Sequence, residues 1–341
     1  MSRAFVTGLA GPTLSQDERV FLRDAEPWGL ILFKRNIESP EQVRGLVAAA
    51  REVVGNVPVL VDQEGGRVQR LGPPHWPAYP PGATYGRLYG ADPACGIEAA
   101  RLGARLIAAD LHPLGIDVDC LPLADVPVSG ADWVIGDRAY GTTPEQVSVL
   151  AAAVAEGLMA GGVLPVLKHI PGHGRAMADS HEKLPVVTTD GAALEATDFA
   201  AFRPLGHLPL GMTAHVVFTA LDPTAPATAS PTMIGEVIRK SIGFSGALMS
   251  DDISMGALSG TIGERTRAAI AAGCDLALHC NGRLDEMQAV AQESPILGGA
   301  AARRTDAALA ARRQPDDIDL AAARARFAQL LARDDAKVVV S

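Results

Sequence analysis

The sequence is poor in several features that mark particular classes of protein. Phe, Trp and Tyr make up only 4% of its 341 residues, and its four cysteines contain no Cys-X-X-Cys pair. A disulfide framework and a thiolate zinc site are therefore both disfavoured, and we expect reduced thiols in the cytoplasm. No apolar run is long enough to cross a bilayer, and the first twenty residues do not have the pattern of a signal peptide.

Basic charge is also in short supply. Lys and Arg number 30 against 39 Asp and Glu, which gives a net charge of −9 and a pI near 5.4. Such a chain lacks the electrostatic attraction that binds proteins to nucleic acids and anionic membranes. The sequence therefore favours a small-molecule partner over nucleic acid or membrane. We expect a monomer, because no apolar stripe typical of an interface stands out.

Short apolar runs alternate with longer helical stretches along the whole chain. Ser15 and Glu18 have the spacing of a capping box, and Ser39-Pro40 places a proline at the first position of a helix. Eight strand-then-helix units are typical of a (β/α)8 TIM-type barrel, an α/β fold. The predicted strands are 4–8, 29–33, 57–61, 116–120, 163–167, 208–213, 247–250 and 274–279.

The domain organisation follows from the same pattern. We expect one catalytic barrel domain over residues 1–341, with 316–341 as a C-terminal capping helix and tail. Residues 71–90 have the composition of a long loop, rich in Pro, Gly and Tyr. A doubly wound sheet is the competing fold, but no G-x-G-x-x-G follows the first strand. Helices are predicted from about 15, 39 and 143, and over 92–111, 190–202, 231–240, 261–272, 284–292, 300–312 and 316–331.

Titratable residues gather where the predicted strands end. In a (β/α)8 barrel the active site lies at the C-terminal ends of the strands, so these side chains are expected to surround one opening. The densest stretch is 163–181, which combines a strand with a polar loop. The residues at strand ends are Asp62, Glu64, Lys168, His169, His215, Asp251, Asp252 and His279, and the loops add Arg70 and Arg138.

Two pairs of residues suggest glycosidic chemistry. A carboxylate facing a sugar-sized pocket can attack an anomeric carbon, and the reaction then needs a proton donor. Neighbouring side chains on a strand point to opposite sides, so we assign Asp251 to the pocket and Asp252 to a supporting role. Asp179 and His181 lie two residues apart and have the makings of a carboxylate–imidazole pair for proton transfer.

Metal binding is not favoured by the same loop. His169 and His173 have the i, i+4 spacing of zinc-binding helices, but a Pro-Gly pair between them prevents that helix. We therefore expect no metal and no other cofactor, and assign His173 to bracing the loop. Residues 171–174 are interpreted as the hinge of a mobile loop that carries the proton-transfer pair.

Four motifs in chain order resemble glycoside hydrolase family 3, in particular its short bacterial β-N-acetylglucosaminidases, the NagZ group. They are VDQEGGRVQR, IGDRAYG, KHIPGHG followed by ADSH, and LMSDDISMGAL. Ile170 stands where the family usually has Phe. The resemblance implies that Asp251 is the nucleophile and that His181, partnered by Asp179, is the acid/base. It also implies substrate contacts from Asp62, Arg70, Arg138, Lys168 and His169.

The resemblance further implies a reaction. The enzyme would remove terminal, non-reducing β-linked N-acetylglucosamine (GlcNAc) with retention, through a covalent glycosyl intermediate. The implied substrate is GlcNAc linked to 1,6-anhydro-N-acetylmuramic acid, with or without a stem peptide, in peptidoglycan recycling. Three alternatives stay open: a β-N-acetylglucosaminide phosphorylase, a glycosidase of different sugar preference, and a non-catalytic sugar-binding barrel.

Overall fold

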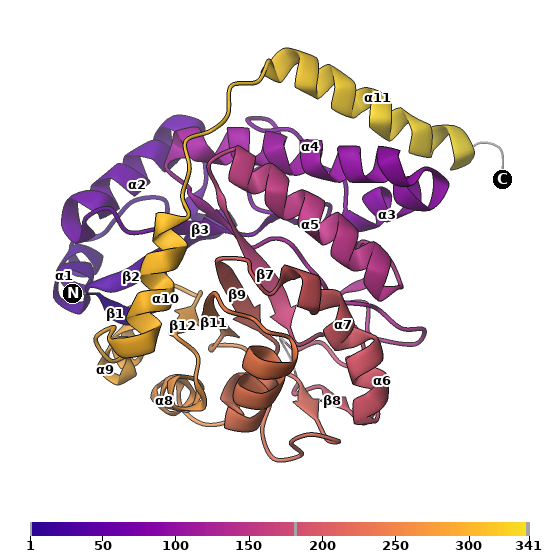
Figure 1. Ribbon diagram of the computed structural model, residues 1–341. Coiled ribbons are helices and arrows are strands. Elements are labelled where there is room, and N and C mark those ends of the chain that lie inside the picture. The colour runs from indigo at the N-terminus through magenta and orange to yellow at the C-terminus, as the bar shows by residue number, and fades with distance from the viewer. Residues whose placement is uncertain (1, 181–182, 339–341) are drawn as a thin grey trace.

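A closed barrel of parallel strands forms the centre of the molecule, and helices surround it (Figure 1). The structure, a computed structural model, describes residues 2–180 and 183–338. The strands follow one another around the barrel in the order β1, β12, β11, β9, β7, β6, β3 and β2. Their bounds are β1 Arg3–Gly8, β2 Pro27–Leu32, β3 Val59–Val61, β6 Val118–Asp119, β7 Leu164–Ile170, β9 Leu210–Thr213, β11 Ala247–Asp252 and β12 Leu276–His279. Each predicted strand overlaps one of these, and the predicted fold class is confirmed.

The helices lie between successive strands and cover the outside of the barrel. Ser15 and Glu18 form the predicted capping box, in which each side chain accepts from the other residue's backbone N–H. The helices are α1 Gln16–Ala25, α2 Pro40–Val54, α3 Gly82–Ala91, α4 Pro93–Leu111, α5 Pro144–Ala160, α6 Gly191–Ala196, α7 Asp198–Phe202, α8 Ile262–Ala272, α9 Leu284–Glu293, α10 Gly299–Ala310 and α11 Leu320–Val338, with a π-helical segment at Met233–Ser241. Two short paired segments, β4 Gln63–Gly65 with β5 Val68–Gln69 and β8 Val186–Val187 with β10 Val217–Phe218, lie outside the barrel.

Helix α3 corrects the expectation that residues 71–90 form one loop. Its glycines lower its intrinsic helix propensity, which is why the sequence pattern missed it. Tertiary packing accounts for one of them, since a Cβ at Gly82 would lie 2.1 Å from the carbonyl oxygen of Arg138. Helix α3 is therefore docked on the backbone of the segment that carries a predicted site residue.

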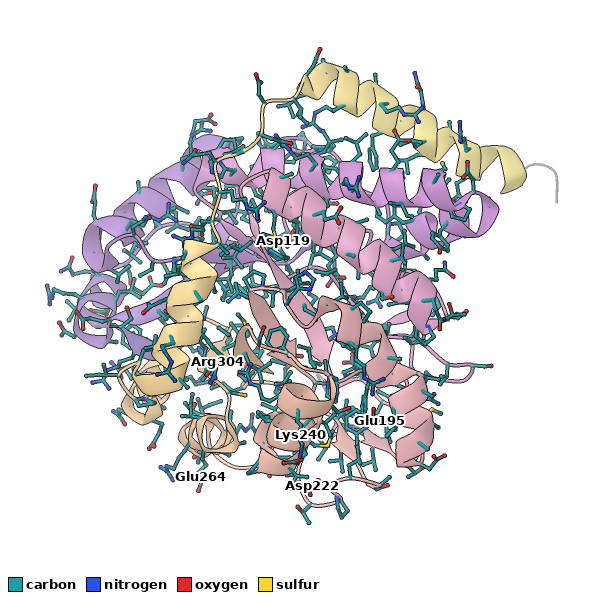
Figure 2. All side chains as sticks on the ribbon, viewed as in Figure 1. Asp119, Glu195, Asp222, Lys240, Glu264 and Arg304 are labelled. Atoms are coloured by element: carbon teal, nitrogen blue, oxygen red, sulfur yellow. The ribbon has the colours of Figure 1, made fainter. Side chains whose placement is uncertain are left out.

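Alternate residues of the strands fill the barrel interior, and the others face the surrounding helices. At the N-terminal end of the strands, Arg304 of α10 donates to Asp275 at 2.8 Å, and Asp275 also accepts from the backbone of Leu248 at 3.0 Å (Figure 2). The interior cluster includes Val6, Ile31, Leu60, Val118, Val166, Leu210, Met249 and Leu276. A filled interior leaves the mouth at the strands' C-terminal ends as the place for a site.

Helix α11 lies outside the barrel along α4, as the yellow helix of Figure 1 shows. Phe327 of α11 packs against the rings of Tyr79 and Tyr85. Arg324 adds an ion pair to Asp110 of α4 at 2.7 Å. No helix within the described ranges is long and apolar enough to cross a membrane. The single-domain organisation over 1–341 stays a prediction.

The close packing of α4 on α5 gives a stability test. A Cβ at Gly157 would lie 2.1 Å from the carbonyl oxygen of Arg101, so the Gly157→Ala variant must shift one helix backbone. We expect a loss of about 1–3 kcal/mol in unfolding free energy, although alanine is the better helix former. Guanidinium-induced unfolding followed by circular dichroism measures it.

The matched control is Gly45→Ala in the middle of α2, where an added Cβ meets no atom within 4 Å. Here only the backbone entropy of the unfolded chain changes, so a gain of about 0.5–1 kcal/mol is expected. Equal effects of the two substitutions would contradict the packing argument.

Candidate active site

A cavity of about 280 Å³ opens at the C-terminal ends of the barrel strands. Larger grooves of about 710 and 630 Å³ lie on the outside, between α4, α5 and α11 and between α1 and α9, away from the strand ends. The cavity brings together seven of the eight residues that were predicted to act on the substrate. It is lined by Asp62, Arg70, Arg138, Lys168, His169, Asp179 and Asp251, together with Ile31, Phe33, Glu64, Arg67, Val68, Val134, Ile135, His173, Ser180, Met212, Asp252, Met255, Leu278 and Cys280.

Lys168 is the most deeply buried cation of the cavity wall, with a side chain only 2% exposed. Its ammonium lies 3.0 Å from Asp62 Oδ1 and 2.7 Å from Glu64 Oε1. Burial disfavours the charged amine, but the two carboxylates outweigh burial and raise the pKa of Lys168 above its usual range. The cavity therefore contains a fixed positive charge at any physiological pH.

Each carboxylate of this network has a second cationic partner. Glu64 accepts two hydrogen bonds from Arg138, at 2.8 and 2.9 Å, in the bidentate geometry that is common for guanidinium–carboxylate pairs. Burial opposes its ionisation, yet Arg138 and Lys168 lower the pKa of Glu64 from 4.5 to about 2. Asp62 Oδ2 accepts a hydrogen bond from Arg70 at 3.0 Å. Burial opposes the ionisation of Asp62, but Lys168 and Arg70 hold its pKa well below the usual range.

Glu64 lines the cavity, as its place after the third predicted strand suggested, although no role was assigned to it from the sequence. Its partner Arg138 comes from the loop after β6, 74 residues away along the chain. Beneath the network, Asp119 of β6 accepts from the backbone N–H of Gln63 at 2.9 Å, and burial raises its pKa well above the usual value (Figure 2). The raised pKa favours a neutral carboxyl group next to the ionised ones.

Strand β7 carries Lys168 and His169 within its length, whereas we expected them just after the strand. All seven residues of β7 are buried, and both of these side chains reach the cavity wall. The Lys168–His169 and Ile170–Pro171 peptide bonds are cis. Fully buried β7 thus places two polar side chains in the wall, and the ion pairs described above balance the charge of the first.

Asp125 holds the two histidines of this region and was missed by the sequence analysis. Its Oδ2 lies 2.7 Å from Nδ1 of His169, and its Oδ1 accepts from the backbone N–H of His173 at 2.7 Å. Burial opposes its ionisation, but the two imidazoles lower the pKa of Asp125. The signal was available, because Asp125 follows the fourth predicted strand as the other polar residues follow theirs.

His173 braces the loop, as predicted. Its Nε2 lies 3.0 Å from the hydroxyl of Ser180, and burial together with neighbouring His169 lowers its pKa to about 4. The turn at residues 171–174 is buried, and the carbonyl of Gly174 accepts from Val128 at 3.2 Å. A hinge at this turn stays a prediction, and the packing favours movement beyond Gly174 over movement within the turn.

Asp251 and Asp252 both end in the cavity wall, although strict alternation predicted only the first there. A register irregularity between Met249 and Asp252 against β12 breaks the alternation, which is the usual effect of a bulge. The supporting role expected for Asp252 is confirmed. Its carboxylate accepts from the backbone N–H and hydroxyl of Ser254, at 3.0 and 2.7 Å, and from the backbone of Cys280 at 3.2 Å.

Two histidines that we expected at the mouth lie behind the wall instead. His215 is fully buried between the hydroxyl of Thr228, 2.7 Å from Nδ1, and the carbonyl of Asp252, 3.0 Å from Nε2. His279 is also fully buried, 3.2 Å from Glu286. A position at a strand end does not decide which way a side chain points, so this part of the prediction was wrong.

His181 lies outside the described residues, so its pairing with Asp179 stays a prediction. Asp179 itself lines the cavity, and its carbonyl accepts from the backbone N–H of Lys183 at 3.0 Å. The part of the chain that the structure describes holds no group of three or more His, Cys, Asp and Glu side chains suited to a metal ion.

Comparison with known proteins matches this geometry to a family. Residues 6–302 fit the model of the "Glycosyl hydrolase family 3 N terminal domain". The chain belongs to glycosyl hydrolase family 3. It is 43% identical over 282 residues to a β-hexosaminidase of Alkalilimnicola ehrlichii, covering 80% of this chain and 79% of that protein. A β-hexosaminidase of Methylococcus capsulatus is 40% identical over 277 residues, with coverages of 80% and 81%.

Solved structures of family 3 agree with the sequence match. NagZ from Neisseria gonorrhoeae in complex with a zinc ion has a TM-score of 0.86 and 31% identity, covering 97% of this chain and 98% of that one. The same protein in complex with N-trifluoroacetyl-D-glucosamine has a TM-score of 0.84 and 32% identity, with coverages of 97% and 96%. The predicted family and the predicted enzyme class, a glycosidase of the β-hexosaminidase type, are confirmed.

The charge network predicts a pH-dependent contribution to stability. The Glu64→Gln variant leaves Arg138 and Lys168 partly unpaired, so near neutral pH we expect a loss of about 3 kcal/mol in unfolding free energy. The pKa of Glu64 is lowered on folding, so its contribution is complete above 4.5 and disappears as the pH falls towards about 2. The difference between variant and wild type should therefore shrink over this window in urea unfolding curves.

Glu236→Gln is the control, because Glu236 pairs with Lys240 on an exposed helix face where ion pairs contribute little. A stability deficit of Glu64→Gln that stays constant down to the lower end of the window would contradict the assignment.

Proposed function

We propose that this chain hydrolyses terminal, non-reducing β-linked GlcNAc with retention of anomeric configuration. The observation that carries the proposal is Asp251, a carboxylate at the end of β11 in the wall of the same small cavity as the Asp62–Lys168 ion pair. The β-hexosaminidase relatives, and the NagZ structure that holds N-trifluoroacetyl-D-glucosamine, support the choice of sugar. The substrate we propose is GlcNAc linked to 1,6-anhydro-N-acetylmuramic acid, with or without a stem peptide.

The cavity wall suits the recognition of one sugar ring. Its volume of about 280 Å³ lies at the small end of the range for ligand sites, so a single monosaccharide fills it. Lys168 and Arg138 present hydrogen-bond donors to hydroxyl and acetamido oxygens, and Asp62 accepts from hydroxyl groups. Arg70 and His169 complete the proposed contacts. Because these groups are paired with one another, they are oriented before the sugar arrives.

In the proposed mechanism a carboxylate oxygen of Asp251 attacks the anomeric carbon while the glycosidic carbon–oxygen bond breaks. His181 donates a proton to the leaving oxygen, which gives a glycosyl ester and a released alcohol. Water then attacks the same carbon and gives one of its protons to His181, while the ester bond to Asp251 breaks. Two inversions give net retention. Asp179 orients the imidazole and stabilises its charged form.

We also propose that the enzyme is a cytoplasmic monomer that acts in peptidoglycan recycling on a soluble substrate, without a cofactor and without a nucleic acid or membrane partner. The acidic composition supports the exclusion of nucleic acid. The four cysteines are buried free thiols, which suits a reducing compartment.

The catalytic assignment is tested with an aryl β-N-acetylglucosaminide. Asp251→Ala should reduce kcat by about 10³-fold or more, because no other group supplies the attacking oxygen, and His181→Ala by about 10²-fold or more. Asp285→Ala, which removes an exposed carboxylate on α9, is the control and should retain wild-type rates. Full activity of Asp251→Ala, or binding of GlcNAc by a wild-type protein that turns nothing over, would overturn the proposal.

Trapping separates the proposed mechanism from its competitors. A 2-fluoro GlcNAc analogue with a good leaving group should label Asp251, because the fluorine slows hydrolysis of the ester. The absence of any label would favour attack by the acetamido oxygen of the substrate, whereas a label on another residue would identify a different nucleophile. In phosphate buffer the product should be free GlcNAc, so a majority of GlcNAc-1-phosphate would make the enzyme a phosphorylase. Loss of activity with EDTA would contradict the absence of a metal.

A further inference from the structure

Two large apolar side chains remain exposed beside the cavity. Trp133 is 67% exposed and Met177 66%, more than any other large hydrophobic residue in the described ranges. They lie on neighbouring loops, because the backbone N–H of Asp132 donates to the carbonyl of Ala176 at 2.8 Å. Each is close to the wall along the chain, since Val134 follows Trp133 directly and Asp179 lies two residues after Met177. These two exposed residues, on hydrogen-bonded loops at the cavity rim, are referred to below as the apolar patch.

The loop that carries Trp133 is held firmly. The guanidinium of Arg67 donates to the backbone carbonyls of Trp133 and Val134, at 2.8 and 2.6 Å. Asp132 accepts from the backbone of Val134 at 2.8 Å, which closes a tight turn. The indole lies against Gly136, where an added Cβ would be 2.8 Å from the ring and where φ is +45°. The backbone on both sides of the ring is thus held and one side of the indole lies on Gly136, while most of its surface stays in water.

A fixed and exposed indole is suited to binding. Water contact with a large apolar surface is unfavourable, and an exposed apolar patch at a cavity rim commonly marks a ligand contact. Little side-chain freedom is lost when a ligand covers a ring that is already immobilised, so the contact yields more affinity. Sugars can use such a ring, because one face of a pyranose is made of C–H groups that pack on an aromatic face.

The size of the cavity decides which sugar meets the patch. With room for one monosaccharide, the cavity is filled by the GlcNAc that is to be released. The leaving group must then lie at the rim. Under the proposed function the leaving group meets the proton donor, which follows Met177 by four residues in the sequence, and the loop with Met177 is hydrogen-bonded to the loop with Trp133.

We propose that Trp133, flanked by Met177, is the binding subsite for the sugar ring of the leaving group. The inference rests on the proposed function and deepens it, since it gives the enzyme a preference for GlcNAc linked to a second pyranose. Binding energy from the contact with this second ring can lower the barrier for reaction at the anomeric carbon. Substrates whose leaving group has no ring gain nothing from the patch.

Kinetics on two substrates test the subsite. With N,N′-diacetylchitobiose, whose leaving group is a pyranose, Trp133→Ala should lower kcat/KM by about tenfold, the loss expected for one stacked ring. Trp133→Phe should recover part of the loss because it keeps an aromatic face. With GlcNAc β-fluoride, whose leaving group has no ring, the same variants should stay within about twofold of wild type.

Ile296→Ala is the matched control. Ile296 is 55% exposed and pairs with Arg3 at the start of β1, at the opposite end of the barrel. This variant should leave both substrates unaffected. An equal loss on the two substrates in Trp133→Ala would indicate a disturbed loop instead of a subsite, and no loss on chitobiose would exclude the contact. Either result overturns the proposal.

Fluorescence provides a readout that does not depend on turnover. The chain has three tryptophans, and Trp28 and Trp76 are buried, so acrylamide quenching reports mainly on Trp133. In an Asp251→Ala background, chitobiose should protect the indole from acrylamide whereas GlcNAc alone should not. The effect of chitobiose on quenching should disappear with Trp133→Phe, because that variant lacks the exposed fluorophore. Equal protection by both sugars, or none by either, overturns the subsite.

The two measurements separate this inference from the proposed function. A wild-type enzyme that hydrolyses neither chitobiose nor the fluoride would refute the hydrolase, whereas the quenching experiment would still decide whether a second ring covers Trp133. Hydrolysis of both substrates with no dependence on Trp133 would leave the hydrolase intact and refute the subsite.

Discussion

The site depends on one buried positive charge. Lys168 sits in the barrel wall with almost no access to water, and such a charge is tolerated only when it is paired and hydrogen-bonded. Its partners, Asp62 and Glu64, come from the adjoining ends of β3 and β4, and each has a further arginine. Three parts of the chain that are distant in the sequence, residues 62–70, Arg138 and Lys168, therefore meet in one network of charges. Removing any one of these side chains leaves another charge without its partner in a part of the barrel wall that water hardly reaches.

A second arrangement of polar side chains supports the loop that follows β7. Asp125 accepts from His169 and from the backbone of His173, and His173 in turn contacts Ser180. The Asp125 carboxylate thus links the loop after β6 to the end of β7 and to the loop that follows β7. The proposed proton donor, His181, follows Ser180 directly in the sequence.

Much of the fold was accessible from the sequence, and so was part of the site. The spacing of apolar residues and the helix-capping residues predict the strands and most helices, because these elements depend on local sequence patterns. Helix α3 was missed because its glycines serve contacts with the backbone near Arg138, which no local pattern reveals. The strand-end rule located Asp62, Lys168 and Asp251 in one cavity. It failed for His215 and His279, because the direction of a side chain depends on strand register and on the partners behind the wall.

The contact between Gly82 and the Arg138 backbone has a consequence for how such a pocket evolves. Helix α3 sits outside the barrel and contributes no residue to the cavity wall. Its position nevertheless limits how far the Arg138 segment can retreat from the mouth. Substitutions on this outer helix can therefore change the width of the opening while every residue that lines the cavity stays the same. Selectivity among related substrates can therefore change during evolution through residues of α3, which are not part of the pocket itself.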